Sequence, residues 1–216
     1  MIPFVFQVLS QMLELHRDSV PTEYRSILPL LLQPASWAQK GSIPALVRLL
    51  SAFLARDGAT LSSTGQFTNV LAVIQQRLIP SKVNDIWGFE LLQAVLKFIP
   101  AETLRPYMKS IVTMLLTRLQ TGRTDKYTYE LVRFFMFVCA LNVNSMTPDF
   151  LLVAVEDVQP QLWSQLLGNI FLPQISKIVP KDRKIVIVGL IKMLTESSIT
   201  LSEPAIQHWY VEVMFL

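Results

Sequence analysis

The stretch Ile43-Pro44-Ala45-Leu46 opens an amphipathic segment, and segments with the same layout recur along the chain at steps of about 40 residues. The other openings are Ile2-Pro3-Phe4-Val5, Asn84-Asp85-Ile86-Trp87 and Thr124-Asp125-Lys126-Tyr127. A second apolar segment follows each opening after a short break. Two helices in every 40 to 47 residues or so is the signature of HEAT or armadillo repeats. Because one helix pair cannot bury its apolar face alone, such pairs stack into a solenoid, whose usual work is to bind other proteins.

The apolar spacing places the individual helices. Segment 43–54 is followed by an Asp57-Gly58 break, a cap at Ser63 or Thr64, and a partner helix that Pro80 closes. In 86–99 apolar residues cover almost the whole circumference, which predicts a helix packed by neighbours on several sides. Segments 102–120 and 127–138 continue the pattern.

The repeat becomes irregular around 147–180. Thr147-Pro148 is a good helix start, Asp157 to Pro160 breaks the helix, and Pro173 interrupts again. Lys181-Asp182-Arg183 starts a helix through Leu194, and Ser202-Glu203-Pro204 starts the last one. Strand signals are almost absent. The sequence therefore predicts an all-α HEAT-repeat solenoid of stacked antiparallel helix pairs, with about ten or eleven helices.

The two ends of the chain affect its predicted domain organisation. Natural solenoids finish with polar capping repeats, whereas this chain begins in an apolar run and stops on Met214-Phe215-Leu216. We therefore expect residues 1–216 to be a single segment of a HEAT-repeat superhelix, truncated at both ends.

Composition separates the chain from several functional classes. Of its 216 residues 51% are hydrophobic and 16% are charged, against about 25% charged in typical domains, so we expect most of the length to be folded. No apolar run reaches the roughly 18 residues that span a bilayer, and no signal peptide is visible, so we expect no membrane insertion. The single Cys139 fits a reducing compartment. A net charge of +3 without a basic block does not indicate nucleic-acid binding.

The residue types that carry catalysis or hold metals are sparse. His16 and His208 stand far apart, without acidic or Cys companions at ligand spacing. Cys139 lies in an apolar helix and is expected to be a buried structural thiol. The adjacent pair Glu156-Asp157 is expected to end a helix at the surface. We therefore predict no catalytic, cofactor-binding or metal-ligating residues, and a protein that is not an enzyme.

Two short stretches leave alternatives open. Lys181 to Lys184 is either a docking patch for an acidic partner or the solvated first turn of a helix, and the pattern favours the second. Trp37 lies in a loop from Pro34 to Gly41 and is either a core residue or an interface anchor, because Trp is enriched in binding hot spots.

Several stretches carry a more specific likeness. They are Leu32 to Trp37, Gly41 to Leu54, Ser81 to Asp85 with Gly88 to Leu92, Val158 to Pro160 running on to Leu172 to Ile175, and Val188 to Glu196. In this order, and over most of residues 27–196, they resemble the CAS-type exportins of the importin-β superfamily, which re-export importin-α. None of them is a catalytic motif.

The resemblance implies the C-terminal portion of a longer nuclear transport receptor. Receptors of this family carry importin-α out of the nucleus as a ternary complex with the GTP-bound Ran GTPase, and GTP hydrolysis on Ran releases the cargo in the cytoplasm. The partners that it implies are therefore importin-α and Ran in its GTP form, for a protein that shuttles between nucleus and cytoplasm.

The amphipathic phase suggests where a partner would bind. The second helix of each solenoid pair lines the concave face. The polar residues that these helices turn toward solvent are therefore the candidate contacts. They are Asn69, Gln76 and Arg77 on one helix, and Lys109, Thr113 and Gln120 on the next. Two other functions stay open. A HEAT scaffold or adaptor of another kind has the same periodicity. An all-α enzyme or lipid-binding domain would need polar groups that converge in a pocket, and the sparse His, Asp and Glu inventory argues against it.

Overall fold

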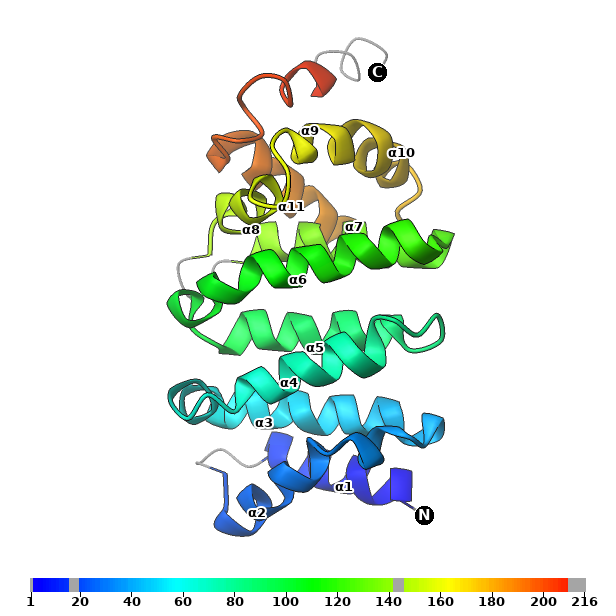
Figure 1. The fold of residues 1–216 in the computed structure, drawn as a ribbon, viewed down its shortest axis with the longest axis vertical. Coiled ribbons are helices and arrows are strands. Elements are labelled where there is room, and N and C mark those ends of the chain that lie inside the picture. The colour runs from blue at the N-terminus through cyan, green and yellow to red at the C-terminus, as the bar shows by residue number, and fades with distance from the viewer. Residues whose placement is uncertain (1, 16–19, 142–145, 210–216) are drawn as a thin grey trace. The chain divides into compact units, whose positions relative to one another are not determined.

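A computed structural model describes residues 2–15, 20–141 and 146–209 of the chain. Helices are the only regular elements in these ranges, and eleven of them are α-helices (Figure 1). The prediction of an all-α fold is therefore confirmed. The chain divides into two compact units, unit 1 (Met1–Thr103) and unit 2 (Leu104–Leu216).

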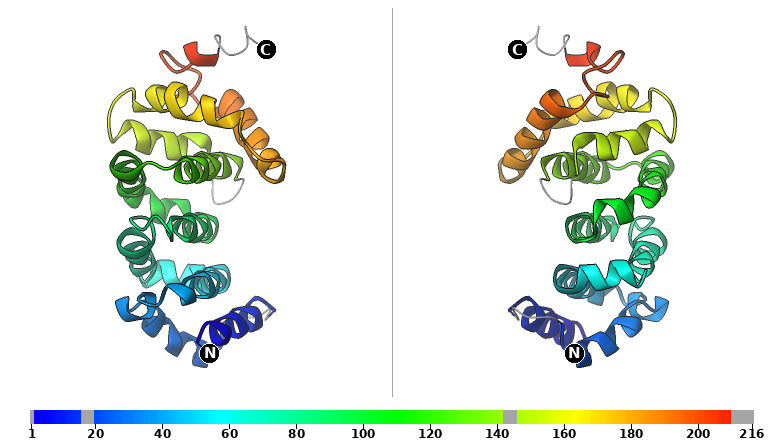
Figure 2. Two further views of the ribbon diagram at one scale, coloured as in Figure 1. Left: turned by 90° about the vertical axis from the view of Figure 1, so that its right-hand side faces the viewer. Right: turned by 90° about the vertical axis from the view of Figure 1, so that its left-hand side faces the viewer.

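Unit 1 is a stack of helices in two rows. Its helices are α1 (Ile2–Leu15), α2 (Thr22–Leu31), η1 (Pro34–Trp37), η2 (Lys40–Ser42), α3 (Ile43–Ser63), α4 (Phe67–Val73), η3 (Ile74–Leu78) and α5 (Asp85–Phe98). Helix α3 packs against both α1 and α5. In the side views of Figure 2 these three form one row, and α2 and α4 lie in the other. Each helix of the longer row is thus stacked on its neighbours in the row and on a helix of the opposite row.

Helix α5 confirms the prediction of a helix covered on several sides. Its buried residues lie around most of its circumference: Asp85, Gly88, Phe89, Leu91, Leu92, Ala94, Val95 and Leu96. Only Glu90 and Lys97 are exposed, and Gln93 is half-buried. A helix with this little polar surface would not be stable without neighbours on opposite sides.

The expected break at Asp57-Gly58 is present as a kink, because Asp57 has non-helical backbone angles inside α3. The expected cap at Ser63 or Thr64 is wrong, since α3 continues to Ser63 and α4 begins only at Phe67. The glycine at the kink also serves packing. A Cβ atom at Gly58 would lie 2.6 Å from the backbone oxygen of Phe98, so only glycine lets α3 approach the end of α5 this closely.

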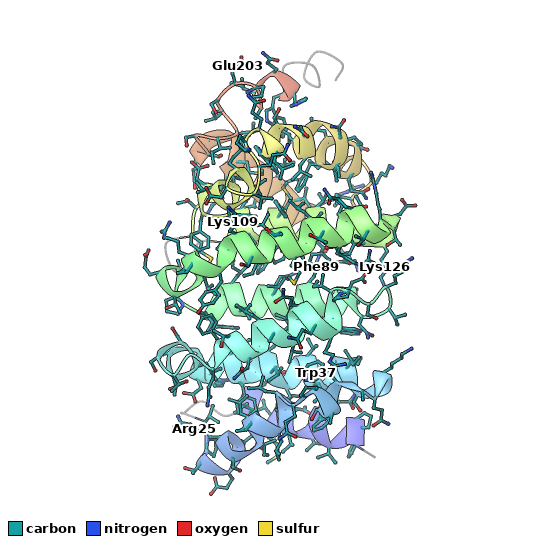
Figure 3. All side chains as sticks on the ribbon, viewed as in Figure 1. Arg25, Trp37, Phe89, Lys109, Lys126 and Glu203 are labelled. Atoms are coloured by element: carbon teal, nitrogen blue, oxygen red, sulfur yellow. The ribbon has the colours of Figure 1, made fainter. Side chains whose placement is uncertain are left out.

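Trp37 belongs to the core of unit 1, which resolves the alternative that the sequence left open. Its side chain is buried, and its indole Nε1 donates a hydrogen bond of 2.8 Å to the carbonyl oxygen of Leu31. Figure 3 shows it among the side chains of this unit. A buried indole with a satisfied N–H is a packing residue of this fold.

Unit 2 contains most of α6 (Ala101–Gly122) and all later elements. These are α7 (Asp125–Ala140), α8 (Pro148–Glu156), α9 (Leu162–Leu166), η4 (Leu167–Phe171), α10 (Leu172–Ile175), η5 (Pro180–Asp182) and α11 (Arg183–Glu196). Thr124 caps α7, because its side chain accepts a hydrogen bond from the backbone N–H of Tyr127. Helix α11 packs along α7. The core contains Trp163, which is stacked on Phe135 at 6.2 Å and meets Phe171 edge-on at 5.0 Å.

Both units contain a turn of π-helix immediately before a proline. The backbone N–H of Ile79 donates to the carbonyl oxygen of Ile74, five residues earlier. In the same way, the N–H of Leu172 donates to the carbonyl oxygen of Leu167. A proline ring clashes with the carbonyl group four residues earlier, and widening the preceding turn relieves the clash at Pro80 and Pro173. The expectation that Pro173 interrupts the helix is therefore wrong, since α9, η4 and α10 run on without a break from Leu162 to Ile175.

The last expected helix start, at Ser202-Glu203-Pro204, is also wrong. Residues 201–206 form turns, and helical backbone begins at Gln207. Side chains hold this segment on the unit: the indole of Trp163 donates to Thr200, and His208 meets the Ser164 hydroxyl at 3.0 Å. Tertiary contacts, rather than local capping, decide its path.

A polar cluster fixes the start of α11 on α7. Asp182 is buried and accepts hydrogen bonds from the Tyr129 hydroxyl at 2.6 Å and from Arg133 Nε at 2.9 Å. Burial acts to raise the pKa of Asp182, but the hydrogen bonds from Tyr129 and Arg133 outweigh it and lower the pKa. Burial and the bond to Asp182 raise the pKa of Tyr129 to about 12. The stretch Lys181 to Lys184 is therefore neither a patch nor a solvated turn as a whole, because its acidic member is part of the core.

We expect Gly189→Ala to destabilise the protein by about 1–3 kcal/mol, the usual cost of overpacking. A Cβ atom at Gly189 would lie 2.5 Å from the backbone oxygen of Met136, so α11 and α7 would have to separate. The control is Gly41→Ala, because a Cβ at Gly41 meets nothing within 4 Å. Urea unfolding measures both variants; equal stability of Gly189→Ala and the unmodified chain would contradict the close packing.

We expect Asp182→Asn to lower the free energy of unfolding at pH 7 by about 1.5–3 kcal/mol, the value of hydrogen bonds to a charged group. Because the folded-state pKa of Asp182 is lowered, its contribution is present above the unfolded pKa of about 3.9 and is lost as pH falls through the folded pKa. The stability difference between the two proteins should therefore shrink below about pH 4. The exposed Asp157→Asn is the control, and a difference independent of pH would contradict the assignment.

Candidate functional site

All six candidate contact residues are exposed, so the exposure expected from the amphipathic phase is confirmed. Asn69 is on α4, Gln76 and Arg77 are on η3, and Lys109, Thr113 and Gln120 are on α6 (Lys109 is labelled in Figure 3). The structure brings them to two separate places, one in each unit. Their contact with a partner stays a prediction.

In unit 1, Asn69 lies at the rim of a shallow recess of about 300 Å³. The recess is formed by the end of α2, the start of η1 and the start of α4, and its lining is Pro29, Leu32, Gln33, Pro34, Gln66 and Asn69. Gln76 and Arg77 are not among the lining residues. They lie on the same continuous helical stretch, in the π turn that precedes Pro80.

In unit 2, Thr113 and Gln120 line a larger groove of about 420 Å³ between α6 and the segment 158–170. We call it the α6–α9 groove. Its lining is Thr113, Leu116, Thr117, Leu119, Gln120, Val158, Gln159, Leu162, Gln165, Leu166, Asn169 and Ile170. The volume falls in the range of about 300–1,000 Å³ that is usual for ligand sites. Lys109 lies one turn before Thr113, whose hydroxyl donates to the Lys109 carbonyl.

The α6–α9 groove combines an apolar floor with polar, uncharged edges. Leu116, Leu119 and Leu166 are buried and form part of the floor. Four amide side chains stand at the edges: Gln120, Gln159, Gln165 and Asn169. None of these amides is hydrogen-bonded to another group within the described ranges. An amide offers donors and an acceptor together, so the edges can bond to the backbone of a bound polypeptide while the floor takes an apolar side chain.

The side chains whose chemistry could support catalysis have structural roles in the described parts of the chain. Cys139 is fully buried, which raises the pKa of its thiol to about 12 and confirms the expected structural thiol. The Ser164 hydroxyl lies near His208, but Ser164 is itself buried, and the His208 ring fills a notch that a Cβ at Gly168 would close. Glu156 ends α8 and accepts hydrogen bonds from the backbone N–H groups of Gln161 and Trp163.

Two other kinds of feature are absent from the described parts of the chain. Across residues 2–15, 20–141 and 146–209, no group of three or more His, Cys, Asp or Glu side chains is arranged to hold a metal ion. No helix in these ranges combines the length and the apolar character needed to cross a membrane.

Comparison with known proteins identifies the family. The sequence matches the family described as CAS/CSE protein, C-terminus, over residues 1–215. The chain belongs to this family. It is 35% identical to Exportin-2 of Xenopus laevis over 215 residues, which is 96% of this chain and 21% of that protein. It is 38% identical to Exportin-2 of Homo sapiens over 198 residues, or 90% of this chain and 20% of that protein.

A solved CAS/CSE relative shows the same fold. The exportin Cse1 in its cargo-free, cytoplasmic state superimposes with a TM-score of 0.82 at 34% identity, over 94% of this chain and 21% of that one. The HEAT-repeat α-solenoid predicted from the sequence is thereby confirmed. The chain spans about a fifth of the length of the relatives it matches, and these relatives are exportins.

For this CAS/CSE chain, sequence reasoning found one wall of the α6–α9 groove and missed the other. Thr113 and Gln120 follow regular α-helical spacing along α6. Gln165 and Asn169 lie on the stretch that contains the π turn, which adds a residue to one turn and shifts every later side chain around the axis. Fixed helical spacing cannot predict a face across such a shift. The signal available in the sequence was the pair Pro160 and Pro173, which bracket the segment.

Proposed function

We propose that this chain is a segment of a nuclear export receptor, which carries importin-α out of the nucleus as a ternary complex with Ran in its GTP form. Membership of the CAS/CSE family over residues 1–215 carries the proposal. In this proposal the receptor shuttles between nucleus and cytoplasm and is not itself an enzyme, because the GTP hydrolysis that ends a transport cycle takes place on Ran.

The described surface supports protein binding as the activity. The α6–α9 groove is wide, uncharged and bordered by amides without protein partners, which suits a polypeptide better than a nucleotide or a metal ion. The recess beside Asn69 has a similar lining, with amides from Gln33 and Gln66 beside Pro29 and Leu32. We propose these two places, together with Gln76, Arg77 and Lys109, as the partner-contacting surface.

Helix α1 supports the further proposal that the chain is one segment of a longer superhelix. One face of α1 is apolar and exposed, and it consists of Phe4, Val5, Val8, Met12 and Leu15. Leu15 is 74% exposed and Phe4 is 68% exposed. A row of large apolar side chains on a stacking helix is what another repeat would cover, and we propose that a preceding repeat packs there.

Calorimetry of the chain with importin-α, in the presence and absence of GTP-loaded Ran, tests the proposed function. We expect binding that is at least about fivefold tighter with Ran, the lower end of usual coupling between sites. If only a longer receptor binds, this chain forms one wall of the site. If neither binds, the export function is wrong, and a HEAT scaffold of another kind becomes the better description.

Charge reversal tests the proposed contact surface. We expect Arg77→Glu and Lys109→Glu in the full-length receptor to weaken partner binding, chiefly by slowing association, because exposed charges at an interface act mainly on the encounter. Lys126→Glu is the matched control, since Lys126 is an exposed basic residue on the first turn of α7, outside the candidate set. Unchanged binding in both test variants would remove Arg77 and Lys109 from the surface.

A further inference from the structure

The positive charge of the chain is concentrated in residues 177–184, which form the end of the loop after α10, η5 and the start of α11. Their sequence is Lys-Ile-Val-Pro-Lys-Asp-Arg-Lys, so four residues are basic and one is acidic. The resulting net charge of +3 equals that of all 216 residues, which leaves the remainder of the chain neutral overall. The four basic side chains are exposed. We call them the basic patch: Lys177, Lys181, Arg183 and Lys184.

The acidic residue of this segment does not neutralise the basic patch. Asp182 is buried, and its carboxylate accepts hydrogen bonds from the Tyr129 hydroxyl and from Arg133 Nε, so it pairs with α7. Lys181 acts on Asp182 only through a weaker Coulomb attraction. No member of the basic patch forms an ion pair with a residue that the structure describes. The positive charge of the patch is therefore left on the surface.

The backbone beneath the basic patch is held in place by unit 2. Asp182 is bonded to α7 in the middle of the segment, and Ile178 and Val186 are buried on either side of it. Lys181 and Lys184 are three residues apart, so they are neighbours on the helix surface. A partner that contacts them has to order side chains but no backbone, and this smaller loss of conformational freedom favours binding.

We propose that the basic patch binds an acidic segment of a partner polypeptide. Lys ammonium groups pair with carboxylates as point charges, and carboxylates are what the surface of this segment lacks. Between Lys177 and Lys181 lies an apolar spot, because Val179 is 39% exposed and Pro180 is exposed. This spot can take an apolar side chain of the same acidic segment. The proposal gives the chemistry of one partner contact, and it rests on the proposed function in so far as the chain binds polypeptides.

Nucleic acid fits this surface less well than an acidic polypeptide. Sites for single-stranded nucleic acid combine basic side chains with aromatic rings on which bases stack, and residues 177–184 contain no aromatic residue. The planar fork of Arg matches a phosphate group in two places, whereas three of the four residues of the basic patch are Lys. A polypeptide with carboxylate and apolar side chains matches both the charges and the spot at Val179.

Fluorescence anisotropy with the 216-residue chain tests the proposal. The probe is a short fluorescein-labelled peptide composed of Glu, Leu and Ser. We expect it to bind, and its affinity to fall several-fold when the salt concentration rises from about 50 to about 200 mM, because salt screens exposed charges. The same peptide with Gln in place of each Glu should not bind.

Charge reversal locates the binding on the chain. Lys181→Glu combined with Lys184→Glu should weaken peptide binding at least about fivefold, because two exposed pairs turn from attraction to repulsion. Replacement of both residues by Gln is the milder second variant and should have a smaller effect. The matched control is Lys40→Glu combined with Lys82→Glu, which changes the net charge equally at exposed positions in unit 1. It should change binding less than about twofold, because distant exposed charges are screened.

Three results would overturn the proposal. The Glu peptide does not bind, the control pair weakens binding as much as the patch pair does, or oligothymidine or phosphatidylserine vesicles bind through the same two lysines more tightly than the peptide. The export function is measured separately, with importin-α and GTP-loaded Ran. A chain that binds these partners but not the peptide would refute the acidic-segment proposal alone, and the opposite result would refute the export function alone.

Discussion

A helix that is apolar around most of its circumference is stable in water only where neighbours cover it on more than one side, and both units depend on this constraint. In unit 1 it applies to α5, where only Glu90 and Lys97 are exposed. In unit 2 it applies to α7, which buries residues from Tyr127 to Cys139 around its axis and packs against α11 and α8. Since no isolated helix pair meets the constraint, each repeat folds only with its neighbours. The individual helices are therefore stable only when the repeats are stacked on one another.

Close backbone approach is the second element of this packing, and two glycines make it possible. Gly58 lets α3 approach the backbone of Phe98, and Gly189 lets α11 approach the backbone of Met136. In a helical sequence a glycine reads as a break, because its intrinsic helix propensity is low. Where another backbone lies against it, the same residue instead permits a contact that no side chain could allow. A glycine inside a helix destabilises it by about 1 kcal/mol relative to Ala. At these two positions the close packing of two helices offsets that loss.

The sequence was sufficient for the features that depend on local periodicity. These include the all-α class, the extents of α5, α6 and α7 to within a few residues and the exposure of the six candidate residues. It was insufficient where tertiary contacts decide. The close approach of α3 to Phe98 at Gly58 could not be seen in the sequence, and the path of residues 201–206 depends on Trp163 and Ser164. The second wall of the α6–α9 groove depends on a π turn, which shifts the side-chain phase in a way that fixed spacing cannot follow.

The distribution of charge bears on how this surface recognises other proteins. The net charge of +3 over 216 residues is small, and no charged residue lines the α6–α9 groove, so long-range steering toward the groove is weak. Affinity there must come from the fit of apolar side chains to the floor and from hydrogen bonds to the amides, which salt screens little.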